Sequence, residues 1–259
     1  HPLYLLSFLS ECKLDNKQKA IEKLSEKIFG HRNNEGFFIF RHRTNKRSTK
    51  NESDLFRKWI LCEQPIVLNA LISFGYKNDS RIRELIPRLY EMGSKNGWCC
   101  FNDPFLGLFN EKTPEDIEHP HCPYANILML RLMGRFPEYH KKENVINGIQ
   151  ALKHQWDQKD SIKPHLFGMG PDFAKLKFPH VWFDILHIVE TLSLYPHMHK
   201  DDFFLSLLEE IKETISPDRR FFAGSVYRPW KKWDFGQKRN PSSWITFKVY
   251  NILRRTDNL

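Results

Sequence analysis

The sequence predicts an all-α fold, an α/α toroid in which four to five helical hairpins form a partial barrel with an inner and an outer helix ring. Two observations predict it. Apolar, helix-like segments recur about every 60 residues, as from Cys62 to Cys122, and a long regular period is typical of stacked helical repeats. Each apolar segment is followed by a more polar, amphipathic one. The repeating unit is therefore a helical hairpin.

The apolar segments are predicted to form the inner ring. They span Leu61 to Phe74, Cys122 to Phe136, Val181 to Tyr195 and Trp244 to Arg254. A helix that is apolar around most of its circumference must be enclosed by other elements. We therefore expect these four helices to be covered by the rest of the chain.

The polar segments are predicted to form the outer ring. They span Lys17 to Ile28, Ser80 to Met92, Glu143 to Trp156 and Asp202 to Ile215. In the last of them Phe203, Leu207 and Ile211 make an apolar stripe at helical spacing. A turn with an aromatic residue follows the polar segment, at Gly36–Phe37–Phe38, Gly97–Trp98 and Arg220–Phe221–Phe222. We expect the aromatic side chain to fold back between adjacent hairpins.

Length and composition favour one domain over residues 1–259. Residues 1–54 are interpreted as a degenerate first repeat plus a basic loop, and residues 55–259 as repeats two to five. No apolar run is long enough for a transmembrane helix, and the start lacks the basic region of a signal peptide. The five cysteines are an odd count that favours reduced thiols. These features predict a cytoplasmic protein, whose natural chain can extend beyond His1.

The net charge of +9 gathers in two stretches. Arg41 to Lys50 resembles a solvated loop. Arg219 to Arg239 mixes basic residues with Trp230 and Trp233, so this stretch could meet an anion. Excess basic charge more often serves solubility than a nucleic-acid site. No nucleic-acid motif accompanies this stretch, so the sequence disfavours nucleic acid and favours a protein or peptide partner.

Residues with metal-binding and catalytic chemistry lie at the starts of the predicted inner helices. They are Cys62, His119, His121, Cys122, His180 and Asp184. If the repeats are in register, equivalent positions lie side by side around one opening. Thiolates and imidazoles are the ligands that Zn²⁺ prefers, and a helix N-terminus stabilises a thiolate such as that of Cys122. The alternative is that the cysteines pack as small apolar side chains.

Asp184 has two interpretations. Burial would raise its pKa and make it a general acid. Equally, its carboxylate could cap or hydrogen-bond a neighbouring helix, as satisfied buried polar groups commonly do. Both stay open on the sequence alone.

Over roughly residues 55–255 the chain resembles the prenyltransferase and squalene-cyclase (terpenoid-cyclase) repeat superfamily, and more closely its small prokaryotic members. The resemblance rests on the repeated inner helices, the Gly-aromatic turn, the run from Phe178 to Leu186, Asp234 to Gln237, and Pro241 to Thr246. It implies a toroid around an apolar, aromatic-lined cavity for isoprenoid chains. The aromatic residues expected to line it are Tyr124, Trp182, Phe183, Trp244 and Phe247. Packing in the core is the alternative for each.

The resemblance also implies metal ligands. Cys122 and His180 match the zinc-binding Cys and His of protein prenyltransferase β subunits. Pro120 stands where that family has its Asp, so His121, His119 or Asp184 would have to replace it. The stretch Pro114 to Glu118 lacks the basic residues that grip a diphosphate, and the Asp-x-Asp-Asp motif of the cyclases is absent.

Two functions fit these residues. The first is a terpenoid-cyclase-like or prenyltransferase-like protein that holds a hydrophobic, isoprenoid-like ligand, with Cys122 and Asp184 as catalytic residues and zinc as the cofactor. The second is a non-catalytic scaffold that binds a protein or peptide through its basic, Trp-bearing face. In both, dimerisation could cover the end of an incomplete array.

Overall fold

The computed structural model describes residues 2–40, 60–99, 122–158, 171–181 and 183–258. Every regular element in these ranges is a helix, and the backbone pairs outside the helices are isolated bridges. The prediction of an all-α fold is confirmed, whereas the toroid stays a prediction. None of the helices in the described ranges is long and apolar enough to cross a membrane.

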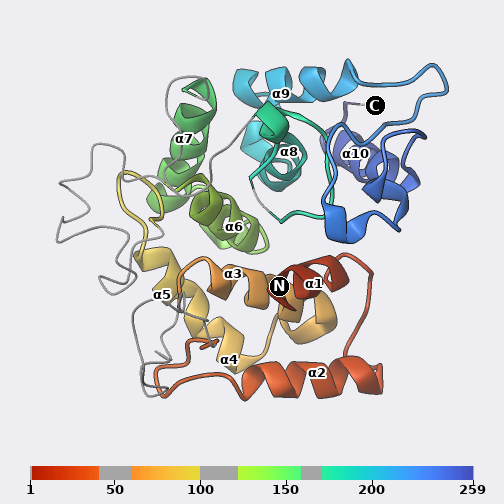
Figure 1. Ribbon diagram of the computed structural model, residues 1–259. Helices are drawn as coiled ribbons and strands as arrows, with labels where there is room; N and C mark the ends of the chain where they lie inside the picture. Colours follow the sequence, from red (N-terminus) through yellow and green to blue (C-terminus); the bar gives the residue numbers. More distant parts are fainter. Residues whose placement is uncertain (1, 41–59, 100–121, 159–170, 182, 259) are drawn as a thin grey trace, which may run out of the picture. The chain divides into compact units, whose positions relative to one another are not determined.

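Backbone contacts divide the chain into two compact units. Unit 1 comprises His1–Met92 and Cys99–Pro120, and unit 2 comprises Gly93–Trp98 and His121–Leu259. Figure 1 draws the helices of both units. Each unit is described by itself below.

Unit 1 is built around helix α3 (Glu63–Leu71), every residue of which is buried. Helix α1 (Pro2–Leu9) packs against α3. Helix α3 continues into the π-helical turn η2 (Ile72–Tyr76), where Gly75 has a φ of 100°. The outer elements are α2 (Lys19–Phe29), α4 (Ser80–Arg83) and α5 (Leu85–Glu91). The predicted helix from Ser80 to Met92 is thus divided into two short ones.

Unit 2 contains two helical hairpins and a final helix (Figure 1). Helix α6 (Pro123–Met133) packs against α7 (Glu143–Asp157), and α8 (Ile185–Leu192) packs against α9 (Asp202–Lys212). Helix α8 also contacts both α6 and α10 (Ser243–Arg255). Short helical turns complete the unit: η4 (Pro137–Tyr139), η5 (Pro171–Ala174), η6 (Pro196–Met198), η7 (Arg228–Trp230) and η8 (Asp234–Gly236). The consecutive apolar helices therefore lie side by side, as the repeat predicts.

Burial separates the enclosed helices from the last one. In α6 every residue except Arg131 is buried, and in α8 every residue except Glu190. Helix α10 buries only one stripe, which consists of Ile245, Lys248, Val249, Ile252 and Leu253. The prediction of an enclosed helix holds for α6 and α8, whereas α10 is amphipathic and contacts α8 and the turn η8.

The aromatic turns are fixed by a polar side chain from the next apolar helix. In unit 1 the Gln64 side chain accepts a hydrogen bond from Phe38 N and donates one to Phe38 O, at 2.9 and 2.8 Å. In unit 2 Asn126 does the same with Trp98, at 2.9 Å each way. Gly36 lies two residues before Phe38 and Gly97 directly before Trp98, with φ of 91° and 75°, so the two turns differ in length but share the side-chain contact from the next helix.

The third aromatic turn keeps only part of this arrangement. Phe221 N donates to Thr246 Oγ1 at 3.0 Å, and Arg219 takes the positive φ (59°) where the other turns have glycine. Phe38, Trp98 and Phe221 are all completely buried. Their burial agrees with aromatic side chains that fold back into the protein; their place between adjacent hairpins stays a prediction.

The start of α8 differs from the prediction. The sequence predicts a helix from Val181, but α8 begins at Ile185 and its N-cap is Asp184, whose φ of −154° is extended. The carboxylate of Asp184 accepts a hydrogen bond from the His187 backbone N at 2.9 Å, which satisfies one free donor of the first turn. The helix begins late because Asp184 is a good N-cap.

Candidate functional site

The candidate site lies in unit 2, at the start of α8, and its central residue is Asp184. This side chain is completely buried. One carboxylate oxygen, Oδ1, caps the helix, while Oδ2 has no hydrogen-bond partner among the described residues. Most buried polar atoms have a partner; Asp184 Oδ2 shares its unpaired state with several other buried side-chain atoms of the described residues, such as Asn69 Oδ1 and Thr191 Oγ1.

Burial raises the pKa of Asp184 from its ordinary value of 3.8 to about 6. Desolvation is the largest cause, because it disfavours the charged carboxylate. The charge of His180, the hydrogen bond from the His187 backbone, the charge of Lys177 and a hydrogen bond from the Leu186 backbone work in the opposite direction and are weaker. The capping interpretation of Asp184 is therefore confirmed, while its role as a general acid stays a prediction that the raised pKa favours.

Two histidine rings are stacked on each other at the start of α8. The His180 and His187 rings are stacked, with centroids 4.4 Å apart and planes inclined by 15°. His187 belongs to the first turn of α8, and His180 to the segment that leads into it. Like Asp184 Oδ2, the Nδ1 atom of His180 is buried without a hydrogen-bond partner among the described residues. Asp184 Oδ2 and His180 Nδ1, from residues four positions apart, thus both lack a hydrogen-bond partner among the described residues.

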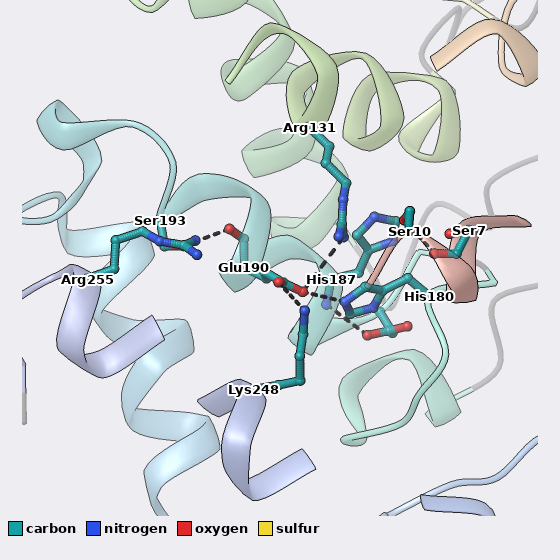
Figure 2. Close-up of polar contacts among 10 residues, drawn as sticks. Ser7, Ser10, Arg131, His180, His187, Glu190, Ser193, Lys248 and Arg255 are labelled. Atoms are coloured by element: carbon teal, nitrogen blue, oxygen red, sulfur yellow. Dashed lines mark hydrogen bonds and ion pairs between the residues drawn. The ribbon is translucent and has the colours of Figure 1, made fainter. Parts of the chain in front are cut away.

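Glu190 connects His180 to two cations. Its Oε2 lies 2.5 Å from His180 Nε2 and 3.7 Å from a guanidinium nitrogen of Arg131, and its Oε1 accepts a hydrogen bond from Lys248 Nζ. Figure 2 shows these three side chains converging on Glu190 from α6, α10 and the segment before α8. All four side chains are at most 12% exposed. Glu190, His180, Arg131 and Lys248 therefore form a buried ionic cluster in which Glu190 contacts the other three side chains.

Glu190 is ionised in this cluster. Burial by itself raises its pKa, but the charges of Lys248 and Arg131 and the hydrogen bond from His180 outweigh burial and hold the pKa well below its ordinary value. A carboxylate only accepts hydrogen bonds, so His180 Nε2 must carry the proton and donate it. The other ring nitrogen, Nδ1, has no hydrogen-bond partner among the described residues.

Aromatic rings cover one side of the cluster. Phe178 is completely buried and contacts His180 edge to face, with ring centroids 5.2 Å apart. The Phe178 ring also lies 5.9 Å from Lys248 Nζ and 5.5 Å from the Trp244 ring. Aromatic faces stabilise positive charge at such distances. The polar centre therefore has a wall suited to cationic groups.

The described residues do not form the predicted zinc site. Cys122 is buried at the N-cap of α6, and its Sγ accepts a hydrogen bond from Ala125 N at 3.4 Å. His180 uses Nε2 for Glu190. Among the described residues no three His, Cys, Asp or Glu side chains gather so that they could hold one metal ion. His119 and His121 lie outside these residues, so zinc stays a prediction, and no step below depends on it.

The remaining predicted cysteines are separate from the candidate site in the chain. Cys62 is the N-cap residue of α3 in unit 1. The four described cysteines, Cys12, Cys62, Cys99 and Cys122, are free thiols. The basic stretch from Arg41 to Lys50 lies outside the described residues.

The predicted cavity aromatics separate into two groups. Tyr124 and Phe183 are buried, and Phe183 lies near Phe173 with ring centroids 6.3 Å apart. Trp244 is half-buried and Phe247 is 48% exposed, so the latter lies on the surface of unit 2 rather than within packed side chains. Trp182 lies outside the described residues. The sequence could not separate these groups because both occur at helical spacing.

Sequence reasoning missed Glu190, Arg131, Lys248 and His187. A signal for Glu190 and Arg131 exists: each is the single Asp, Glu, Lys or Arg residue of a mostly apolar helix. Arg131 lies five residues before Phe136, and Glu190 five residues before Tyr195, so the two occupy equivalent repeat positions. Opposite charges at equivalent positions of adjacent enclosed helices predict an ion pair.

The arrangement suits proton transfer. It combines a buried carboxyl group whose pKa is raised to about 6, an imidazole hydrogen-bonded to an ionised carboxylate and aromatic rings around that imidazole. No known protein family matches this chain, and no curated protein matches it. The site is therefore interpreted from its own geometry.

Proposed function

We propose that this chain is a terpenoid-cyclase-like or prenyltransferase-like protein that binds a hydrophobic, isoprenoid-like ligand and transfers a proton to or from it at Asp184. The observation that carries the proposal is the buried Asp184 carboxyl group, with a pKa of about 6 and an oxygen that has no hydrogen-bond partner among the described residues. A neutral carboxylic acid in apolar surroundings can donate a proton that a solvated carboxylate cannot.

The roles of the residues follow from their contacts. Asp184 Oδ2 gives its proton to an electron-rich double bond or oxygen of the ligand and becomes a carboxylate. His180 Nδ1 is placed to accept a proton when the cation that forms is later deprotonated. Glu190 positions His180, and the Phe178 ring stabilises developing positive charge. The predicted zinc plays no part in these steps.

The proposal is tested with isoprenoid probes in deuterium oxide. Wild-type protein is incubated with farnesol, geranylgeraniol and squalene, and solvent deuterium in the recovered isoprenoid is measured by mass spectrometry. We expect incorporation with the wild type and its loss in Asp184→Asn. Asparagine is also a good N-cap, so the variant keeps the helix start and loses the acid.

The matched control is Asp202→Asn, at an exposed position in the first turn of α9. It removes an equal charge and should leave deuterium incorporation unchanged. Probe binding is measured for all three proteins by tryptophan fluorescence. Absence of both binding and incorporation in the wild type would contradict the proposal, as would equal incorporation by the wild type and Asp184→Asn.

A further inference from the structure

Four aromatic side chains form a continuous ridge on unit 2. The aromatic ridge consists of Trp230, Trp233, Trp244 and Phe247 around the buried ring of Phe235. Neighbouring ring centroids are 5.7 to 6.4 Å apart along the chain of contacts from Trp230 through Phe235 to Phe247. Trp233 and Phe247 are each 48% exposed, and the other two are half-buried. A joined group of exposed rings usually marks an interaction site.

Five basic residues flank this ridge. The basic patch consists of Arg228, Lys231, Lys232, Lys238 and Arg239, all exposed. Within the described part of the chain none of the five has a carboxylate partner. Residues 228–247 carry these five positive charges and the negative charge of Asp234, a net charge of +4. The surface therefore attracts an anionic partner.

The ridge is held in one shape by local contacts. Oδ2 of Asp234 accepts hydrogen bonds from Ser242 Oγ and Trp244 N, each at 3.0 Å, which ties the turn to the start of α10. Gly236 lies so close to the turn before it that a Cβ there would be 1.9 Å from Trp230 O. A surface that is already ordered loses little conformational entropy on binding.

We propose that the aromatic ridge and the basic patch together bind the surface of an anionic lipid membrane. Aromatic rings of Trp and Phe insert at the boundary between headgroups and acyl chains, and nearby lysines are attracted to anionic headgroups. Three of the five cations are lysines, whose compact charges on flexible stems suit a diffuse layer of headgroups better than bidentate recognition of one carboxylate.

Other occupants fit the surface less well. Successive bases of a single-stranded nucleic acid stack on open aromatic faces. Here the exposed neighbours are inclined, Trp230 to Trp233 by 53° and Trp244 to Phe247 by 54°, and Trp233 stacks on Phe235. A second copy of the chain would bring two patches of net charge +4 together, which repel each other.

The test is co-sedimentation with vesicles of phosphatidylcholine alone and of equimolar phosphatidylcholine and phosphatidylglycerol. We expect binding to the anionic vesicles only, weakened by salt. The triple variant Lys231→Gln/Lys232→Gln/Lys238→Gln should bind on the order of 100-fold more weakly, since each basic residue contributes about a fivefold factor. Trp233→Ser/Phe247→Ser should lower the affinity about tenfold at unchanged charge.

Matched variants separate the surface from general charge and hydrophobicity. Lys19→Gln/Lys23→Gln/Lys27→Gln removes three exposed lysines of α2, and Ile146→Ser removes an exposed apolar side chain of α7. Both should bind the anionic vesicles as the wild type does. Circular dichroism of every variant checks that the helices are retained.

Three results would overturn the proposal. The first is equal binding to both kinds of vesicle or to neither. The second is an equal loss of binding in the α2 variant and the basic-patch variant. The third is displacement from anionic vesicles by oligothymidine or polyglutamate at equal charge concentration, which would assign the surface to nucleic acid or to an acidic peptide.

Discussion

The starts of α6 and α8 occupy equivalent places in successive repeats but differ in chemistry. At the start of α6, Asn126 is completely buried and its side chain makes three hydrogen bonds to backbone atoms of Trp98 and Cys122. At the start of α8, Asp184 is buried equally deeply, yet one of its oxygens has no partner among the described residues. The amide of Asn126 at the start of α6 is thus fully hydrogen-bonded, whereas Asp184 at the start of α8 has one oxygen without a partner among the described residues.

The two helix starts therefore differ in whether their buried polar group can titrate. A neutral amide in α6 fixes the aromatic turn without any titrating group. In α8 a carboxyl group with a raised pKa takes the cap, and His180 and Glu190 follow beside it. Unpaired buried polar atoms reduce stability. Asp184 Oδ2 is one of several such atoms among the described residues, together with Asn69 Oδ1, Gln155 Oε1 and Thr191 Oγ1.

The largest expected effect belongs to Glu190→Gln. The change leaves Arg131, Lys248 and His180 around a neutral amide, and breaking a buried ionic cluster destabilises a protein by about 3 to 5 kcal/mol. We expect this loss in the free energy of unfolding at pH 7, measured by urea denaturation. Because the pKa of Glu190 is lowered in the folded state, the loss should shrink as the pH falls through that lowered pKa.

The control for Glu190 is Glu209→Gln, whose side chain is 63% exposed and pairs with Lys212 on the surface of α9. This variant should unfold at nearly the same urea concentration as the wild type. Equal stability of the two variants would show that the Glu190 cluster does not stabilise unit 2.

Asn126→Ala is expected to have the next largest effect. It leaves the buried backbone N–H and C=O of Trp98 without their partners, at a cost of about 3 kcal/mol. Thermal unfolding followed by circular dichroism measures the loss. A change below about 1 kcal/mol would mean that water replaces the amide, and the contrast between the two helix starts would disappear.

A pH-dependent effect of about 3 kcal/mol or less is expected for Asp184→Asn. The folded-state pKa of about 6 lies above the ordinary 3.8. Above pH 4 the unfolded wild type loses the Asp184 proton more readily than the folded wild type does. The free energy of unfolding of the wild type therefore falls as the pH rises from 4 through 6. The variant should match the wild type near pH 4 and be the more stable protein at pH 8. Parallel stability curves from pH 4 to 8 would contradict the raised pKa.

The smallest effect is expected for Thr246→Val in the third aromatic turn. The hydroxyl accepts a single hydrogen bond, from Phe221 N, so its removal should cost about 1 kcal/mol. The loss should be smaller than that of Asn126→Ala in the same assay. A larger loss of stability in Thr246→Val than in Asn126→Ala would contradict the expectation that the Trp98 turn is held more strongly than the Phe221 turn.

Much of the fold could be predicted from the sequence because helical periodicity depends on local residue patterns. The apolar segments at Leu61, Cys122 and Trp244 correspond to α3, α6 and α10. The start of α8 was misplaced by four residues because Val181, Trp182 and Phe183 continue the apolar pattern, whereas a cap depends on the backbone angles of Asp184.

Less of the site could be predicted. Asp184 and His180 were identified from their positions at helix starts. Glu190, Arg131 and Lys248 come from α8, α6 and α10, and their meeting depends on the relative rotation of three helices. The exposure of Phe247 also depends on which side of α10 packs against α8 and η8. Such facts arise from packing, which spacing along the chain does not encode.

The most direct test of the account is the titration of the Asp184 side chain by NMR of protein with ¹³C-labelled aspartate. We predict one aspartate signal with a midpoint near pH 6, absent from Asp184→Asn and retained in Asp202→Asn. If instead every aspartate titrates at or below the ordinary value of 3.8, Asp184 is a capping carboxylate without the proton that the proposed chemistry requires.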